Sequence, residues 1–329
     1  MINLFRNYNP INIIWLAVLL VALRVCFLFT GPTHVELNLV ESFARSLLPV
    51  TYGDMLSLPV NMLIAGILVL AQAVLLNYVV NFYNLLSKPS FLPALMYITV
   101  SSLFTPFLTI SPPLICNFLL IWMIFKLLAF YKSGDVKSLS YDLGMIVALG
   151  SIFYLPFIYL FLVIWIALLI FRPFDWRDWL AAVMGYVTIF FFLAVFYYLT
   201  DHIQNFYKIW VPLGTRFPNR IRVLNYQNYF LLIPVVIILI LGFFRLRSNF
   251  FRSYILVRKS FQLFFLAFII AGLAFYVKAD FRLNHFLLCA VPVAIFFSYY
   301  FLYATTRWIY ETLYFLLFAG IIYFQFNTF

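Results

Sequence analysis

Two glutamates lie in a polar stretch, residues 31–50, that directly follows the first apolar segment of the chain. Around them, residues 33–48 predict a helix that lies on the membrane surface. At about 100° per residue, apolar side chains share one face of this helix and polar ones share the other. Glu41 lies on the polar face four residues before Arg45, a spacing typical of a solvated ion pair. Glu36 falls on the apolar face, where an ionised carboxylate is costly unless it has a partner.

Two roles are open to Glu36. In the structural role, Thr33 and Glu36 form a capping box, in which the glutamate accepts a hydrogen bond from the backbone N–H of Thr33. In the functional role, Glu36 faces a polar cavity between helices and acts on a substrate as a base. One residue could serve both purposes.

A cluster of arginines is the second candidate for chemistry. Arg216, Arg220 and Arg222 lie within residues 212–229, and Arg282 is a further candidate. The planar guanidinium binds phosphate oxygens with two parallel hydrogen bonds, so these residues predict a phosphate-binding or lipid-binding site. The alternative is that they bind the head groups of ordinary phospholipids.

Arg24 and the histidines are supporting candidates. Arg24 lies six residues before the end of the first apolar segment, about 9 Å along a helix, so it can extend towards the membrane surface or pair with Glu36. His34, His202 and His285 are expected on the same side of the membrane. Their spacing fits no metal motif, so no metal ligand is assigned, and His285 is best explained as an interface histidine with satisfied hydrogen bonds.

The composition identifies the class of protein that must position these residues. The chain has 329 residues, of which 66% are hydrophobic and 9% are charged, and its mean hydropathy is +1.06. Apolar runs of about 20 residues recur along the chain, which predicts an all-α, polytopic membrane protein. The runs are continuous rather than alternating, which excludes a porin-like barrel. In a soluble protein the net charge of +11 would suggest nucleic-acid binding. In a membrane protein it indicates instead which loops lie on the cytoplasmic side.

We predict a bundle of about 11 transmembrane helices (range 9–11) in a single integral membrane domain, residues 1–329, with an uncleaved first helix. The predicted helices lie near residues 11–30, 57–80, 91–109, 114–131, 142–154, 156–171, 179–199, 228–244, 260–277, 284–304 and 308–325. The pairs within 91–131 and 142–171 are separated by prolines.

The distribution of Lys and Arg predicts the orientation. Cations collect on the cytoplasmic side of membrane proteins. A cytoplasmic N-terminus places on the inner side Arg6, Lys88, Lys126, Lys132, Lys137, Arg172, Arg177, Arg245, Arg247, Arg252, Arg258, Lys259 and Arg307. It leaves a smaller set outside: Arg45, Lys208, Arg216, Arg220, Arg222, Lys278 and Arg282. The first outer loop is then 31–56, the second is 200–227, and residues 244–259 form a basic inner loop.

The layout around Glu36 resembles that of the C-type glycosyltransferases, polytopic enzymes that use a lipid-linked sugar donor. THVELNLVESFARSLL (residues 33–48) is similar to their first outer loop, where an acid precedes an amphipathic helix. Residues 151–186 resemble their middle region, and residues 281–301 resemble a late segment with a basic residue and a central proline. The sequence as a whole also resembles an uncharacterised family of polytopic inner-membrane proteins of Bacteroidota.

The resemblance implies roles for the candidate residues. A carboxylate of the first outer loop serves that family as catalytic base or metal ligand, and the role falls here to Glu36, with Glu41 as second choice. The donor would be a sugar on a polyprenyl phosphate, so the site needs a base for the acceptor hydroxyl and a cation for the departing phosphate.

The sequence is therefore compatible with three functions. The first is a membrane glycosyltransferase, or a degenerate relative, that uses a polyprenyl-phosphate sugar at the outer face of the bacterial inner membrane. The alternative is a non-catalytic membrane subunit that scaffolds a cell-envelope assembly or binds lipid. The third is a lipid flippase or transporter. Expected partners are membrane lipid, the lipid-linked sugar and a further membrane protein, with no nucleic acid; no cofactor is required, although a divalent metal is compatible with the first function.

Overall fold

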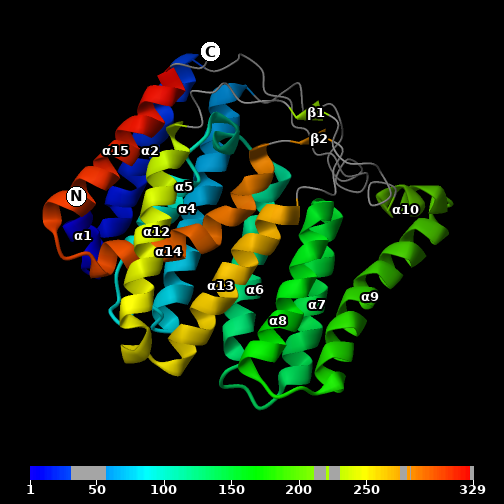
Figure 1. The fold of residues 1–329 in the computed structure, drawn as a ribbon. Coiled ribbons are helices and arrows are strands. Elements are labelled where there is room, and N and C mark those ends of the chain that lie inside the picture. Colours follow the sequence, from blue (N-terminus) through cyan, green and yellow to red (C-terminus); the bar gives the residue numbers. More distant parts are fainter. Residues whose placement is uncertain (31–56, 211–219, 222–229, 275–279, 282, 327–329) are drawn as a thin grey trace.

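A computed structural model describes residues 1–30, 57–210, 220–221, 230–274, 280–281 and 283–326. The described elements are helices apart from one pair of two-residue strands, and turns and short irregular segments connect them (Figure 1). The first half of the chain forms α1 (Ile2–Arg6), α2 (Asn12–Thr30), α4 (Leu58–Phe82), α5 (Leu92–Val100), η2 (Thr105–Leu108), α6 (Pro112–Ala129), α7 (Val136–Phe153), η3 (Leu155–Leu160) and α8 (Phe161–Phe171). The second half forms α9 (Trp176–Leu199), α10 (Ile203–Trp210), β1 (Arg220–Ile221), α12 (Leu232–Asn249), η5 (Phe250–Arg252), α13 (Ile255–Leu273), β2 (Asp280–Phe281), η7 (Leu283–Cys289), α14 (Ala290–Tyr303) and α15 (Arg307–Phe326).

The helices confirm the expected class. Eight helical segments of 18 to 25 residues are long and apolar enough to cross a membrane. At about 1.5 Å per residue they are about 27 to 38 Å long, which matches a hydrocarbon core of about 30 Å. Two shorter apolar helices, Asn12–Phe27 and Leu155–Phe171, accompany them. The chain is thus a helical membrane protein by the length and composition of its helices.

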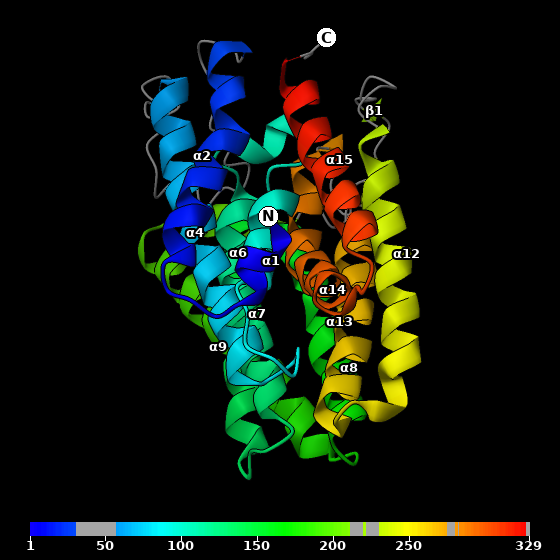
Figure 2. The ribbon, with the colours of Figure 1, turned by 90° about the vertical axis from the view of Figure 1, so that its left-hand side faces the viewer.

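Two helices form the centre of the bundle. All nine residues of α5 are buried, and the segment Leu283–Tyr303, which contains α14, is 83% buried. The peripheral helix α9 is only 22% buried and exposes large apolar side chains, as a helix in contact with lipid does. Figure 2 shows α14 nearly end-on, below the lower end of α15. At the end of α14, Arg6 donates hydrogen bonds to the carbonyls of Phe301 and Ala304, at 2.6 to 3.0 Å, and so caps this helix.

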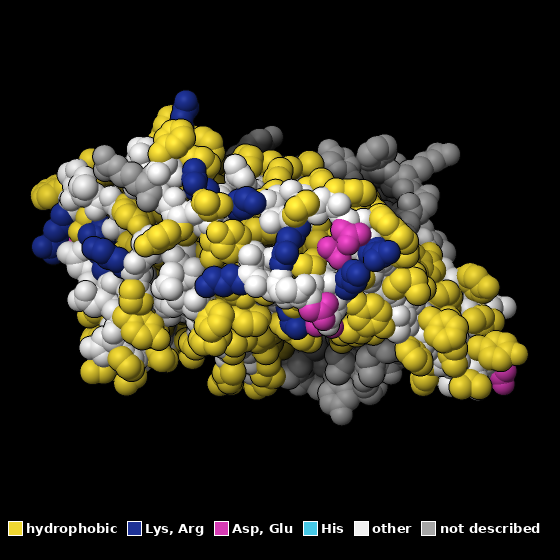
Figure 3. All heavy atoms as spheres, turned by 90° about the horizontal axis from the view of Figure 1, so that it is seen from below, with side chains coloured by type: hydrophobic (Ala, Val, Ile, Leu, Met, Phe, Trp, Pro, Cys, Tyr) yellow, Lys and Arg dark blue, Asp and Glu magenta, His cyan; other side chains and the backbone are white. Residues whose placement is uncertain are grey.

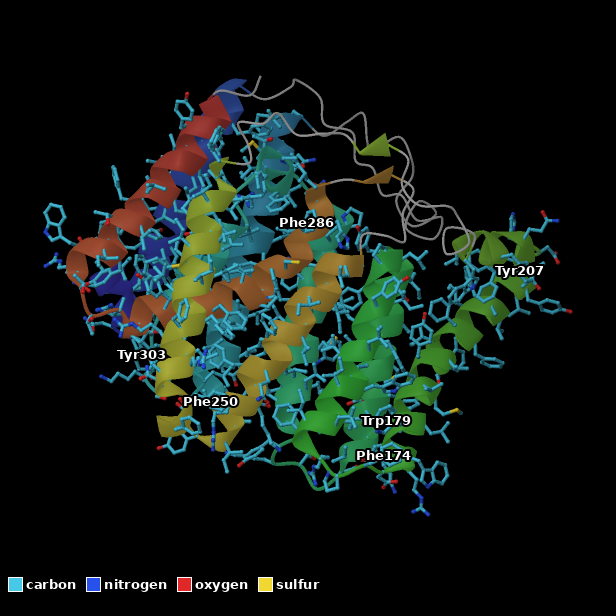
Figure 4. All side chains as sticks on the ribbon, viewed as in Figure 1. Phe174, Trp179, Tyr207, Phe250, Phe286 and Tyr303 are labelled. Atoms are coloured by element: carbon cyan, nitrogen blue, oxygen red, sulfur yellow. The ribbon has the colours of Figure 1, made fainter. Side chains whose placement is uncertain are left out.

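Alternate connections lie on two opposite sides of the bundle (Figure 1). We call one the basic side, because many cations of the chain lie in or next to the connections after α4, α6, α8, α12 and α14, which are on that side. Seen from below, Lys and Arg side chains are spread across this side with a few acids (Figure 3). The aromatic side chains of Phe174, Trp179, Phe250 and Tyr303 lie in the lower part of the bundle (Figure 4), and aromatic residues are common near a membrane interface. The opposite side, which holds β1 and β2, is called the strand side.

The helix pair α7–α9 is joined through glycines. A Cβ atom added at Gly144 would lie 2.0 Å from the carbonyl oxygen of Ala182, and one added at Gly185 would lie 2.0 Å from that of Tyr141. The two backbones are therefore in direct contact at this crossing. Small residues at such crossings are typical of helices that associate within a membrane.

The largest difference from the sequence prediction is at residues 91–109, which were expected to form one helix. The helix ends at Val100, and residues 101–111 continue as an irregular segment containing only the short 3-10 helix η2. Pro106 prevents an α-helix from running through this segment, because proline lacks the N–H that the helix interior requires, and Pro112 and Pro113 occupy the first turn of α6. This segment, which we call the 101–111 segment, is nevertheless largely buried in the bundle.

Smaller differences affect helix ends. The helix expected at 142–154 begins at Val136, because the carboxylate of Asp135 accepts a hydrogen bond from the Ser138 N–H and caps it. The helix expected at 260–277 begins at Ile255, and the one expected at 228–244 runs from Leu232 to Asn249.

Candidate functional site

Most of the predicted site residues fall outside the described part of the chain. These are Glu36, Glu41, His34, Arg216, Arg222 and Arg282. For Arg220 the structure gives the backbone, whereas Arg24 and His285 are described with their side chains. The elements that adjoin the predicted residues in the chain include α2, α4, β1, β2 and η7.

Two of the predicted arginine segments are joined by backbone pairing. Strands β1 and β2 run parallel, with Arg220 opposite Asp280 and Ile221 opposite Phe281. Arg222 and Arg282 are the next residues along the chain after the two strands. The pairing therefore brings together two segments that are 60 residues apart, and each segment carries cations.

An apolar groove of about 590 Å³ lies between α12 and α13. Its walls are side chains of these two helices, and its floor comes from η7, α14 and the 101–111 segment. The residues that line it are Val100, Leu103, Phe104, Phe107, Leu232, Val235, Val236, Leu239, Phe268, Ile269, Gly272, Leu273, Leu283, Phe286, Cys289, Ala290 and Val293. Figure 4 shows Phe286 in the half of the bundle that adjoins the strand side. A groove of this size and lining suits an apolar chain.

One end of the groove reaches the strand side. Leu232 begins α12, Leu273 ends α13, and Leu283 begins η7, and all three line the groove. Leu283 is two residues after β2, with Arg282 between them in the chain. The groove thus has an apolar interior and an end next to the paired, cation-bearing segments. This arrangement can bind an amphiphile with an apolar chain and an anionic head.

The position of the Arg24 side chain differs from the sequence prediction that it extends to the membrane surface. Its side chain does not extend to the surface: it is only 4% exposed, and its Nη1 donates to the carbonyl oxygen of Leu108 at 3.2 Å. Its Nε and Nη2 atoms have no hydrogen-bond partner among the described residues. The alternative partner, Glu36, lies outside these residues. A buried arginine in a membrane helix is an indication of function, because its charge is costly there.

A buried hydrogen-bonded network, which sequence reasoning missed, joins α4, α5, α6 and η7. The Gln72 amide donates to the Leu114 carbonyl at 2.6 Å, and Tyr97 donates its hydroxyl to Gln72 at 2.7 Å. Asn117 donates to the Tyr97 hydroxyl at 3.1 Å and to the Leu287 carbonyl at 3.0 Å. The sequence feature that indicates such a network is a set of isolated Asn and Gln residues inside apolar helices.

His285 has the structural role that the sequence favoured. It is buried, with Nδ1 2.8 Å from the Tyr154 hydroxyl and Nε2 2.8 Å from the Ala271 carbonyl oxygen. Ala271 lies in the last turn of α13, where carbonyls lack helical partners, so His285 satisfies one of them. This contact requires the proton on Nε2, which leaves Nδ1 to accept from Tyr154. His202, by contrast, is exposed, and no group of three or more His, Cys, Asp or Glu among the described residues could hold a metal ion.

Comparison with known proteins gives a family but no activity. No curated protein and no solved structure shows significant similarity to the chain. The model of the DUF6427 family, a family of unknown function, matches residues 43–329, which include the groove and both strands. Because this match covers most of the chain, the protein belongs to the DUF6427 family.

Proposed function

We propose that the protein is a membrane glycosyltransferase, or a degenerate relative of one, that binds a polyprenyl-phosphate sugar from the outer leaflet of the bacterial inner membrane. The basic side would face the cytoplasm, following the positive-inside rule, and the strand side would face outwards. This orientation corresponds to about eleven crossings with a cytoplasmic N-terminus. It places the open end of the groove where a lipid-linked donor would present its head group.

The observation that carries the proposal is the apolar groove whose end adjoins β1 and β2. The polyprenyl chain would occupy the groove, where only apolar side chains meet it. The phosphate would then lie beside the segments of Arg220, Arg222 and Arg282, with Arg216 nearby in sequence. Arginine suits this task because its guanidinium stays charged and binds two phosphate oxygens at once.

Group transfer also needs a base for the acceptor hydroxyl. Glu36 is the proposed base, with Glu41 as second choice, because both lie in the outer loop that connects α2 to α4. The bond between the sugar and the phosphate oxygen breaks, the acceptor oxygen bonds to the sugar, and the polyprenyl phosphate leaves with its charge stabilised by arginine. A divalent metal bound by a carboxylate is compatible with this scheme.

A second candidate is a non-catalytic subunit that holds a lipid. It is favoured by one observation: no carboxylate lines the groove among the described residues. The same groove would then bind a lipid chain and present its head group to a partner protein. A flippase has less support, since the described helices place few acids within the membrane to couple transport to protons.

Binding can be tested with a photoactivatable polyprenyl phosphate in nanodiscs that contain the full chain. Val236→Trp fills the groove and is expected to reduce crosslinking several-fold. Val187→Trp is the matched control, because Val187 is 49% exposed on α9 and Val236 is 48% exposed on α12. Equal crosslinking of the two variants would contradict the assignment of the groove.

Transfer is tested separately from binding. Glu36→Gln should retain lipid crosslinking and lose sugar transfer, because the amide cannot act as a base. Replacement of Arg216, Arg220, Arg222 and Arg282 by Gln should weaken crosslinking of the phosphate-bearing lipid more than that of the corresponding alcohol. Full transfer by Glu36→Gln would overturn the catalytic role, and lipid binding without transfer in the wild-type protein would favour the non-catalytic subunit.

A further inference from the structure

The 101–111 segment has two chemically different surroundings. Phe104 and Phe107 line the apolar groove on one side. Immediately afterwards, the Leu108 carbonyl accepts a hydrogen bond from Arg24, and the Ile110 N–H donates to the side-chain oxygen of Asn61 at 2.8 Å. Arg24 belongs to α2 and Asn61 to α4, so this segment joins both helices through polar contacts that the groove does not use.

Arg24 and Asn61 leave only hydrogen-bond donors unused. Arg24 is 4% exposed, and its Nε and Nη2 have no partner among the described residues. Asn61 is fully buried; its oxygen is engaged with Ile110, and its amide nitrogen has no partner among the same residues. A guanidinium has no acceptor atom, and the free atom of Asn61 is its amide nitrogen. The unpaired nitrogens of both side chains can therefore be satisfied only by a hydrogen-bond acceptor.

The charge of Arg24 is also uncompensated in the described part of the chain. The ion pairs found there are Lys126–Asp142 and Arg307–Glu311, and neither involves Arg24. Burying a cation without a counter-ion costs free energy, and a bound anion next to Arg24 would lower that cost.

The start of α6 adds to the positive potential. This 18-residue helix begins at Pro112, directly after the 101–111 segment, so its positively polarised end adjoins the segment that Arg24 and Asn61 contact. The side chain of Ser111, which precedes the helix, is buried and makes no capping hydrogen bond. Its hydroxyl has no partner among the described residues and is a further donor for an anion.

We propose that Arg24 and Asn61 form a buried anion site between α2, α4 and the 101–111 segment, and that its ligand is a phosphate group. The unused Nε and Nη2 atoms of Arg24 form one edge of the guanidinium, which suits two oxygens of one phosphate. The Asn61 amide provides a third donor. This site uses residues of α2 and α4 rather than the segments of β1 and β2, and it does not depend on the proposed glycosyl transfer.

The phosphate could belong to a lipid head group or be free, and two assays with the full chain distinguish these sources. The first measures equilibrium binding of radiolabelled inorganic phosphate to the protein in nanodiscs of phosphatidylcholine. The second counts bound phosphatidylglycerol by native mass spectrometry. We expect stoichiometric binding in at least one assay and a loss of about tenfold or more in Arg24→Gln, because a charge-assisted, two-bond contact is removed.

Matched variants separate binding from folding. Arg177→Gln removes an exposed cation of α9 and should leave binding unchanged. Asn61→Asp keeps an acceptor for the Ile110 N–H but places a carboxylate within the proposed site, so it should abolish phosphate binding in a protein at least as heat-stable as the wild type. Arg24→Lys keeps the charge but lacks the planar guanidinium that binds two phosphate oxygens, so this variant should bind phosphate several-fold more weakly. If Arg24→Gln fails to fold, Asn61→Asp and Arg24→Lys supply the test.

Two outcomes would overturn the site. One is the absence of stoichiometric binding in both assays, which would mean that the donors are satisfied by another group. The other is unchanged binding in folded Arg24→Gln or Asn61→Asp, which would place the phosphate elsewhere. Loss of binding in these variants while Val236→Trp still binds inorganic phosphate or phosphatidylglycerol normally would show that the anion site and the groove are independent.

Discussion

The helix pair α7–α9 and the helix group α4–α5–α6 associate by different means. In α7–α9 the backbones touch at Gly144 and Gly185, and no side chain lies between them at that point. In α4–α5–α6 the contact is made through the side chains of Gln72, Tyr97 and Asn117, which form consecutive hydrogen bonds. One interface depends on the absence of side chains and the other on their polarity.

This difference follows from the solvent. Lipid is as apolar as a leucine side chain, so burying apolar surface drives helix association in a membrane much less than in water. Close packing and hydrogen bonding remain as the two sources of stability, and each region uses mainly one of them. The first should be sensitive to added volume and the second to lost donors and acceptors.

Gly144→Ala is expected to have the largest effect. Its new Cβ would meet the Ala182 carbonyl oxygen at 2.0 Å, so the two backbones must separate, at a cost of about 3 kcal/mol. Gly134→Ala is the matched control, because an added Cβ there meets nothing within 4 Å. The free energy of unfolding in mixed detergent measures both. Equal stability of the two variants would show that the backbones are not in contact.

Removal of the network should have an intermediate effect. Tyr97→Phe leaves the buried Gln72 oxygen without its donor and should cost about 1 to 2 kcal/mol of unfolding free energy. Gln72→Met should cost a similar amount, and the double variant should cost less than the sum, because the two residues share one hydrogen bond. Tyr78→Phe, at an exposed tyrosine of the same region, is the control. Strict additivity would indicate that the two side chains act separately.

The smallest effect is expected at the membrane surface. Lys126 and Asp142 form an ion pair at 2.8 Å, but both side chains remain partly exposed. Asp142→Asn should therefore change the unfolding free energy by about 0.5 kcal/mol or less, and any loss should diminish in high salt. An effect as large as that of Tyr97→Phe would show that surface charge contributes to stability as much as the buried network.

The sequence predicted most of the helices but not the end of α5. Apolar runs of membrane-spanning length can be recognised in the sequence, because a helix needs about 20 apolar residues to cross the hydrocarbon core. Residues 91–109 satisfy that criterion, yet the helix ends at Val100. The irregular 101–111 segment is tolerated because it is buried against α2 and α4, whose side chains bind its Leu108 carbonyl and Ile110 N–H.

The candidate site was predicted less well than the fold. Arg24 was recognised, but its burial was not, because a sequence does not show whether a long side chain reaches the surface or turns inwards. Asn61 and Gln72 were overlooked, although they are eleven residues, about three turns, apart and therefore share one face of α4. The orientation in the membrane, the base Glu36 and the arginine cluster stay predictions.

What the sequence by itself determined is the class of protein, the positions of most helices and the uneven distribution of cations. These depend on composition over 20-residue windows and on local proline signals, which are properties of the chain alone. Only the tertiary structure decided the groove between α12 and α13, the pairing of Arg220 with Asp280, and the contacts of Arg24 and Asn61 with the 101–111 segment. Each brings together residues distant in sequence, and the packing that does so depends on the shapes of all neighbouring helices at once.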